Sequence, residues 1–223
     1  LAGLYWTPIS TRLQHAEVAH ILTDSDARLV VTAPEYEPLM AELQGWETPV
    51  SHWFTTGEAN DRFLSVTALI EGQTPLETSS GTPAGADMLY SSGTTGRPKG
   101  VVRLAPPPEL RAQMAEGMRE LCRIAWGITP GVRAMVTAPL YHSAPTSFTQ
   151  QAIQQAEMLV LMPRFDAEQT LALIAEHRIE VVYLVPIMYV RLLRLPAEVR
   201  AKYDLSFVRF VASTGAPCAP EVK

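Results

Sequence analysis

The chain has 223 residues, of which 47% are hydrophobic and 18% charged. This composition is typical of a globular protein and argues against disorder, and the length suffices for a sizeable core in one or two domains. The net charge of −5 argues against a general nucleic-acid binder, and two cysteines make neither a disulfide framework nor a metal-ligand cluster, which favours a reducing, cytoplasmic location.

The first part of the chain alternates helical and strand patterns. Apolar residues recur at helical spacing over residues 12–24, and residues 35–43 predict a second helix that stops at Gly45. Residues 62–71 predict a third helix, which Asp61 could cap. Short β-branched or aromatic runs predict strands at 27–32 and 52–55.

The same alternation continues after the prolines at 106–108. Helices are expected at 109–125, 167–176 and 187–193, and strands at 134–138, 158–162, 181–185 and 207–212. Strands that alternate with helices of this length indicate an α/β fold of parallel βαβ units with right-handed crossovers. The longest apolar run, 181–190, contains Pro186 and is too short to span a membrane, so no transmembrane segment is expected. Cys122 is expected to pack on a helix.

Residues 88–102 form the segment with the most candidate ligand-binding residues. Two short apolar runs, which we expect to be buried strands, flank Ser, Thr and Gly residues together with Arg97, Pro98 and Lys99. Glycines permit backbone angles that turn successive N–H groups inward as a cradle for an anion. Hydroxyl groups and two cations add further donors for phosphate. The segment therefore predicts a polyphosphate-binding loop.

The spacing of this loop disfavours two other phosphate-binding patterns. A Walker-type loop requires Gly-Lys-Ser/Thr, but Lys99 follows Pro98 and precedes Gly100. The dinucleotide fingerprint Gly-x-Gly-x-x-Gly also lacks its first glycine. A serine nucleophile with Lys99 as its base has weak support, and an ordinary Gly/Ser/Thr connection remains an alternative.

The order of residues 90–101, Tyr-Ser-Ser-Gly-Thr-Thr-Gly-Arg-Pro-Lys-Gly-Val, closely resembles the phosphate loop of the adenylate-forming superfamily. This superfamily includes acyl-CoA synthetases, luciferases and the adenylation domains of peptide synthetases. The resemblance implies that residues 1–223 are an incomplete part of the large N-terminal domain, with the phosphate loop at 89–102. One departure is Val102-Arg103-Leu104, where many members have Thr-His after Lys-Gly-Val.

The resemblance also implies roles within the loop. Lys99 would neutralise the β- and γ-phosphates of ATP, and Thr94 and Thr95 would hold phosphate oxygens. The residues expected to shape the backbone nest are Ser91, Ser92, Gly93 and Gly96. Lys99, Thr95 and His142 are the expected catalytic residues.

Two further strand ends carry suggestive residues, and ligands gather at the carboxyl ends of strands in doubly wound sheets. Pro-Leu-Tyr-His at 139–142 resembles a motif in which Tyr141 and His142 face the acid and pantetheine side. Gly215-Ala216-Pro217 resembles the segment along the adenine. Val185 and Pro186 resemble the acid-pocket turn. A hydrogen-bonded structural histidine at 142, a plain turn at 213–217 and a core position for Met188 remain alternatives.

The resemblance implies a parent protein that activates a carboxylic acid with ATP and Mg²⁺, and then transfers the acyl group to coenzyme A. We expect an apolar acid, whether fatty, aryl or steroid-like, in preference to acetate or an amino acid, and a place in fatty acid metabolism. The sequence has no set of His, Cys or carboxylate residues at ligand spacing, so we expect no metal site within the chain. The family's Tyr-Gly-x-Thr-Glu motif, whose glutamate holds Mg²⁺, is not found here, so the fragment itself is expected to be inactive. A nucleotide-binding module and a P-loop-like NTP hydrolase without ligase activity remain alternatives.

Overall fold

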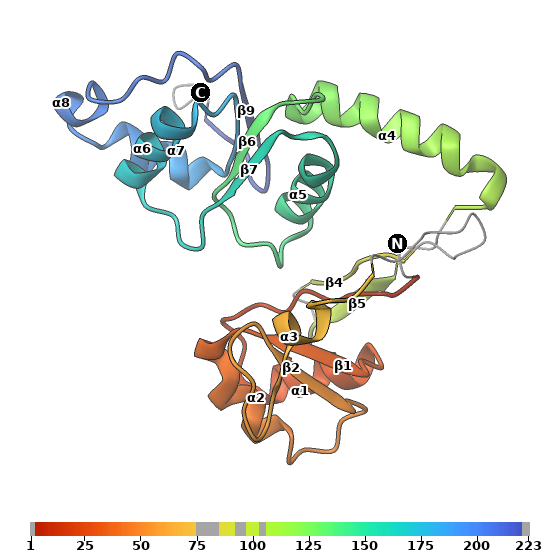
Figure 1. Cartoon of the computed structure of the whole chain (residues 1–223). Coiled ribbons are helices and arrows are strands. Elements are labelled where there is room, and N and C mark those ends of the chain that lie inside the picture. Colours follow the sequence, from red (N-terminus) through yellow and green to blue (C-terminus); the bar gives the residue numbers. More distant parts are fainter. Residues whose placement is uncertain (1–2, 75–84, 92–96, 103–105, 220–223) are drawn as a thin grey trace. The chain divides into compact units, whose positions relative to one another are not determined.

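The computed structural model describes residues 3–74, 85–91, 97–102 and 106–219. The chain divides into two compact units, residues 1–105 and residues 106–223 (Figure 1). Among the described residues, no helix is both long enough and apolar enough to cross a membrane.

The first unit contains a three-stranded parallel sheet in the order β1-β2-β3. Its elements are α1 (His15–Asp24), β1 (Leu29–Thr32), the 3-10 turn η1 (Pro34–Tyr36), α2 (Glu37–Leu43), β2 (His52–Thr55), β3 (Leu64–Ser65) and α3 (Val66–Ile70). Helix α1 begins where the Glu17 carboxylate accepts a hydrogen bond from the Gln14 N–H at 2.9 Å, which satisfies a donor at the helix start. Val18 and Leu22 on this helix pack with Val30 and Leu43 in the core of the unit.

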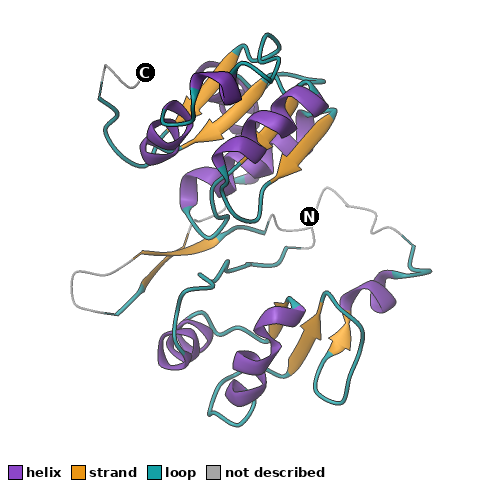
Figure 2. Ribbon diagram, turned by 90° about the vertical axis from the view of Figure 1, so that its left-hand side faces the viewer, coloured by secondary structure: helices purple, strands orange, loops and turns teal. Residues whose placement is uncertain are grey.

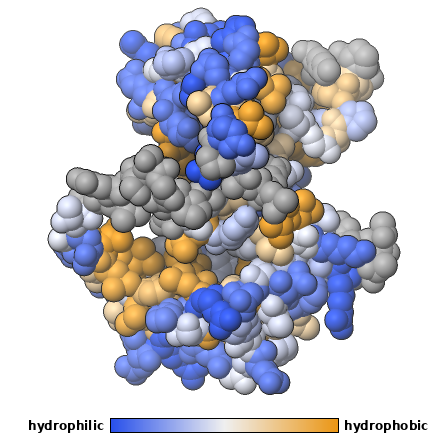
Figure 3. Space-filling model, turned by 90° about the vertical axis from the view of Figure 1, so that its right-hand side faces the viewer, coloured by the Kyte–Doolittle hydropathy of each residue, from blue (hydrophilic) through white to orange (hydrophobic). Residues whose placement is uncertain are grey.

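One face of this sheet exposes apolar side chains. Burial alternates along β1, because successive side chains of a strand point to opposite faces. Leu29, Val31 and Leu64 are each about half exposed. Figure 3 shows apolar side chains gathered on one side of the unit that residues 1–105 form.

The two strands that flank the predicted phosphate loop form an antiparallel hairpin. β4 (Met88–Ser91) pairs with β5 (Lys99–Val102), with Met88 opposite Val102 and Ser91 opposite Lys99. The prediction of two buried strands is wrong for β5, where Val101 and Val102 are 55% and 52% exposed. In β4 only Leu89 is buried, because this hairpin is a separate two-stranded ribbon and not a central part of a layered sheet.

The second unit is a four-stranded parallel sheet with helices on both faces (Figures 1 and 2). The strand order is β7-β6-β8-β9. Its elements are the 3-10 turn η2 (Pro108–Leu110), α4 (Arg111–Trp126), β6 (Arg133–Val136), α5 (Ser143–Gln155), β7 (Met158–Leu161), α6 (Ala167–His177), β8 (Val181–Leu184), α7 (Pro186–Leu193), α8 (Ala197–Arg200) and β9 (Phe210–Ser213). Helices α4 and α5 lie on one face and α6 and α7 on the other, as right-handed crossovers require when the strand order reverses.

The core of this unit is built around its central strands. All four residues of β8 are buried, and the Phe148 ring of α5 meets the Tyr183 ring edge-on at 5.5 Å. Cys122 is fully buried on α4, as predicted, and burial raises the pKa of its thiol. Helix α4 ends at Gly127, whose φ of 68° is left-handed and where a Cβ would lie 2.5 Å from the Phe210 ring.

Two local predictions are wrong, and two helices, α5 and the short α8, had not been predicted. The helix expected over 62–71 begins only at Val66, because Ser65 and not Asp61 caps it by accepting from the Ala68 N–H. Residues 64–65 before it form β3. Helix α5 lacks an apolar stripe of the usual width and carries Pro145 in its first turn, so its sequence resembles a loop.

Candidate functional site

The hairpin β4–β5 brackets the predicted phosphate loop. Ser92, Gly93, Thr94, Thr95 and Gly96 lie outside the described residues. Ser91 ends β4, Lys99 begins β5, and the two stand opposite each other in the ladder. Both are exposed, so the ammonium group of Lys99 is available to an anion beside the Ser91 hydroxyl.

Gly100 is required by the packing of this hairpin. A Cβ at Gly100 would lie 2.3 Å from the Met88 methyl and 2.9 Å from the Tyr90 ring, both on β4. Because Tyr90 and Gly100 are directly paired in the ladder, the aromatic ring lies across the glycine. The Tyr90 hydroxyl then donates to the Asp24 carboxylate at the end of α1, at 2.6 Å.

The carboxyl edge of the four-stranded sheet brings together the remaining predicted residues. Tyr141 and His142 follow β6, Val185 and Pro186 follow β8, and the segment 214–217 follows β9. These strands are all parallel, so their carboxyl ends share one edge of the sheet. Ser91 also ends a strand, but β4 pairs antiparallel with β5 in a separate sheet, so Ser91 is not part of the carboxyl edge of the four-stranded sheet.

The loop after β6 is held by hydroxyl groups. The buried Thr137 hydroxyl lies 2.8 Å from the Tyr183 carbonyl and 3.1 Å from the Met188 sulfur. The Thr146 hydroxyl donates to the Leu140 carbonyl, which joins the loop to α5.

Tyr141 and His142 lie at the end of this loop. Their ring centroids are 4.7 Å apart and the rings are tilted by 58°. His142 is exposed and occupies the N-cap position of α5, where its carbonyl accepts from the Thr146 N–H at 3.1 Å. The imidazole is therefore held at a helix start and is accessible to a ligand.

Two tyrosines hold the last residue of β9 and the residue that follows it. The Tyr183 hydroxyl is hydrogen-bonded to the Thr214 hydroxyl, and Tyr189 of α7 is hydrogen-bonded to Ser213. Burial raises the pKa of both phenols, so both stay protonated at neutral pH. Gly215 follows with a left-handed φ of 87°, which favours glycine at the start of the Gly-Ala-Pro turn.

The turn after β8 divides into exposed and core positions. Val185 is the N-cap of α7, Pro186 is its first residue, and both are partly exposed at the sheet edge. Met188 is only 7% exposed and belongs to the core, which supports the interpretation of Met188 as a core residue. Sequence reasoning missed Thr137 and Tyr183 as supports of this edge. Both could have been found from the sequence, because each carries a hydroxyl within or directly after an apolar strand. Such a hydroxyl needs a hydrogen-bond partner when it is buried.

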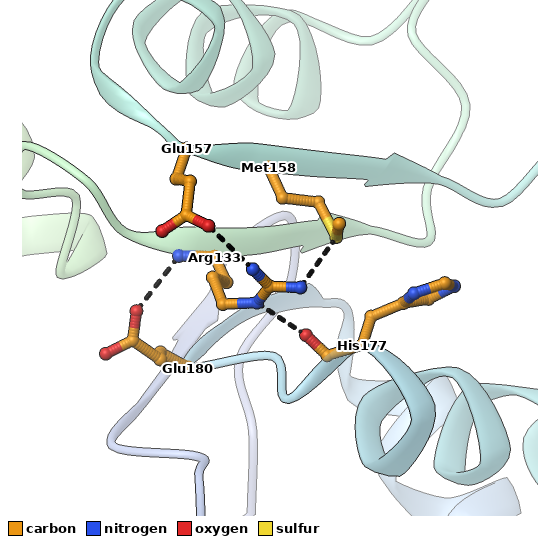
Figure 4. A network of polar contacts seen from close by, with 5 residues as sticks. All are labelled: Arg133, Glu157, Met158, His177 and Glu180. Carbon is orange, nitrogen blue, oxygen red and sulfur yellow. Dashed lines mark hydrogen bonds and ion pairs between the residues drawn. The ribbon is translucent and has the colours of Figure 1, made fainter.

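The opposite edge of the sheet is tied by Arg133 at the start of β6 (Figure 4). Its guanidinium donates to the His177 carbonyl at 2.6 Å, to Glu157 at 2.9 Å and to the Met158 sulfur at 3.3 Å. Its backbone N–H donates to Glu180, which also pairs with Arg209 at 3.3 Å. This network joins the amino ends of all four strands.

The other polar features of the described residues indicate no second site. A shallow depression of about 260 Å³ beside α4 is lined by Glu116–Arg119 and Glu120–Arg123 ion pairs, whose charges already satisfy one another. Within the described ranges, no three His, Cys, Asp or Glu residues lie close enough to hold a metal ion.

Comparison with known proteins identifies relatives along the whole chain. The sequence is 27% identical to a long-chain-fatty-acid–CoA ligase, FadD13, of Mycobacterium tuberculosis, over 96% of this chain and 41% of the ligase. It is 33% identical to a sulfoacetate–CoA ligase of Cupriavidus necator, over 98% of this chain and 41% of that enzyme. The chain thus spans about two fifths of the length of these curated relatives.

The fold is also shared with solved structures. The inhibitor-bound N-terminal domain of FACL13 from Mycobacterium tuberculosis superposes with a TM-score of 0.76 at 23% identity, over 98% of this chain and 52% of that chain. The family described as AMP-binding enzyme matches residues 1–223. The parallel sheets of the two units and the β4–β5 hairpin are consistent with this match. The chain belongs to the AMP-binding enzyme family.

Proposed function

We propose that residues 1–223 belong to an AMP-forming acid–CoA ligase. The observation that carries this proposal is the β4–β5 hairpin, which presents exposed Lys99 opposite Ser91 in a chain of the AMP-binding family. Curated relatives whose names describe fatty-acid, feruloyl and sulfoacetate CoA ligases support the same reaction class.

In this proposal the acid carboxylate attacks the α-phosphorus of ATP, and pyrophosphate leaves. Coenzyme A then displaces AMP from the acyl-adenylate. Lys99 would stabilise the negative charge that develops on the leaving β- and γ-phosphates, and Ser91 would donate to a phosphate oxygen. Such positioned charges lower the barrier because they need no reorganisation as the reaction proceeds.

Residues of the second unit would supply the other ligand surfaces. Gly215, Ala216 and Pro217 would lie along the adenine, and Val185 and Pro186 would line the acid site. Tyr141 and His142 would face the acid and the pantetheine arm. Ser92, Gly93, Thr94, Thr95 and Gly96 would complete the phosphate nest, with Thr95 as a catalytic donor.

Mg²⁺ would accompany ATP and neutralise phosphate charge when bound. The described residues offer no set of carboxylates that fits this ion, so we derive no step through it. The acid is proposed to be apolar, because the partly exposed side chains after β6 and β8 include Tyr141, Val185 and Pro186.

The test is acid-dependent exchange of labelled pyrophosphate into ATP by the full-length parent protein, followed by thioester formation with coenzyme A. A panel of fatty, aryl, sulfonated and amino acids identifies the substrate class. Exchange that requires an apolar acid supports the proposal, and a preference for amino acids contradicts the acid assignment. ATP hydrolysis without acid would favour an NTP hydrolase, and binding of ATP without turnover would favour a nucleotide-binding module.

A further inference from the structure

Helix α1 contacts both arms of the hairpin that brackets the phosphate loop. The Tyr90 hydroxyl on β4 donates to Asp24 Oδ2 at 2.6 Å. On the other arm, His20 Nε2 donates to the Pro98 carbonyl at 3.0 Å, directly before β5 begins at Lys99. Because His20 and Asp24 are four residues apart on one helix, both contacts come from the same helical face.

The path of the Tyr90 side chain depends on the opposite strand. Its ring lies across Gly100, where any Cβ would come within 2.9 Å of the ring. Both strands therefore take part in placing the phenol against α1. Burial, followed by the Asp24 carboxylate, raises the pKa of Tyr90 well above its ordinary value, so the phenol remains a donor at neutral pH.

These contacts tie distant parts of the sequence. Tyr90 and Asp24 are 66 residues apart, and His20 and Pro98 are 78 apart. Helix α1 is itself anchored, because Val18, Ile21 and Leu22 are each no more than 2% exposed. An exposed two-stranded ribbon has little stability of its own, whereas one tied to a packed helix has a defined position.

We propose that α1 is the positioning element of the phosphate-loop hairpin, with Tyr90, Asp24 and His20 as positioning residues that act through the placement of Lys99. Only the expected effect on ATP binding and adenylation rests on the proposed function. The positioning of the hairpin by α1 does not depend on that function.

The direct test is Tyr90→Phe in the full-length parent protein, which removes one hydroxyl and keeps the ring over Gly100. Tyr203→Phe is the matched control, because Tyr203 likewise donates to a carboxylate, that of Glu168 at 3.0 Å, but does so in the second unit. We expect Tyr90→Phe to raise KM for ATP or to lower the rate of pyrophosphate exchange by about five- to twentyfold, as loss of a hydrogen bond to a charged group permits. KM for the acid and the conversion of preformed acyl-adenylate to thioester should change less than twofold.

Conservative variants separate positioning from a general loss of stability. Asp24→Asn keeps an acceptor oxygen for Tyr90 but loses its charge, so it should lose less than Asp24→Ala, which should resemble Tyr90→Phe. The double variant Tyr90→Phe/Asp24→Ala should be no worse than either single variant, because both remove the same bond. His20→Gln should retain a donor to Pro98, and His20→Leu should not. Additive losses, or equal losses in both half-reactions, would overturn the inference.

Amide hydrogen exchange gives a readout that needs no activity. Peptides covering 88–91 and 97–102 should exchange faster in Tyr90→Phe than in wild type, while β6 and β8 should be unchanged. If the parent protein adenylates no acid but the hydrogen-exchange difference is observed, the proposed function fails and the positioning role stands. If exchange in these peptides is the same in both proteins, the positioning role fails whatever the enzyme does.

Discussion

The buried hydroxyl of Thr137 lies 2.8 Å from the backbone carbonyl of Tyr183, and it thereby joins the segment after β6 to strand β8. We expect Thr137→Val to lower the free energy of unfolding by about 1–2 kcal/mol, because a methyl group then faces a carbonyl that has lost a donor. Urea denaturation checks this. Thr137→Ser keeps the hydroxyl and should recover most of the loss, whereas an equal cost for both variants would assign the effect to packing.

Tyr183 acts on the next segment through its hydroxyl. Tyr183→Phe leaves the ring against Phe148 and removes only the hydrogen bond to Thr214. If Gly215-Ala216-Pro217 lies along adenine, KM for ATP should rise about three- to tenfold, since one buried hydrogen bond is lost. Kinetics on the full-length protein measure this.

Thr214→Val is the partner variant for that experiment. It removes the other half of the same bond and should give a similar KM, and the double variant should add nothing further. An unchanged KM for ATP in all three proteins would mean that this segment does not contact the nucleotide.

Lys99 gives a prediction that separates the two half-reactions. Lys99→Ala in the full-length protein should slow adenylation by about two orders of magnitude, because a positioned cation no longer meets the developing negative charge. Conversion of preformed acyl-adenylate to thioester should stay near the wild-type rate. Lys202→Ala, at an exposed lysine of the second unit, is the control. Equal slowing of both half-reactions would contradict the role given to Lys99.

Arg133 gives a prediction about the stability of the fold and not about catalysis. Arg133→Met keeps the aliphatic stem but loses the bonds to the His177 carbonyl and to Glu157, so the free energy of unfolding should fall by about 1–3 kcal/mol. Arg191→Met, at an exposed position of α7, should change it by no more than about 0.5 kcal/mol. Guanidinium denaturation compares the two. A specific effect of Arg133→Met on KM for ATP would be unexpected, because its contacts lie at the amino edge of the sheet.

The isolated polypeptide 1–223 should not exchange pyrophosphate into ATP. It spans about two fifths of its curated relatives, and groups that act together in catalysis lose far more than the sum of their separate effects when several are missing. The measurement uses ATP, Mg²⁺ and the acid panel with the purified polypeptide. Acid-dependent exchange near the rate of the full-length protein would refute this expectation.

Most strands and helices were predictable because apolar periodicity is strong and Gly or Pro residues interrupt it. β8 illustrates this, since a continuous apolar run corresponds to a strand buried at every position. Helix α5 was missed because its buried face includes Pro145, Thr146 and Thr149, which also suit a loop. Similarly, Ser65 and not Asp61 is the N-cap of α3, because the helix start depends on where β3 ends.

The residues of the candidate site were recognisable by type, but their supports were not. Tyr141 and Gly215 follow predicted strands and Val185 ends one, so a shared edge could be expected from topology alone. The bonds from Thr137 to the Tyr183 carbonyl and from Tyr90 to Asp24 join residues far apart in the sequence. No local pattern encodes such pairs, because they depend on how strands and helices pack.

The Arg133 network has a consequence for how such a protein can diverge. Strand alignment in the second unit is secured at the amino ends, where Arg133, Glu180 and Arg209 join β6, β8 and β9. Substitutions in the turns at the opposite ends can therefore accumulate without shifting the strands. If these turns line the acid site, as we propose, changes in short loops alone would be enough to alter the acid preference. A library that tests this would randomise residues 138–142 and 185–187 while leaving residues 133, 157 and 180 unchanged.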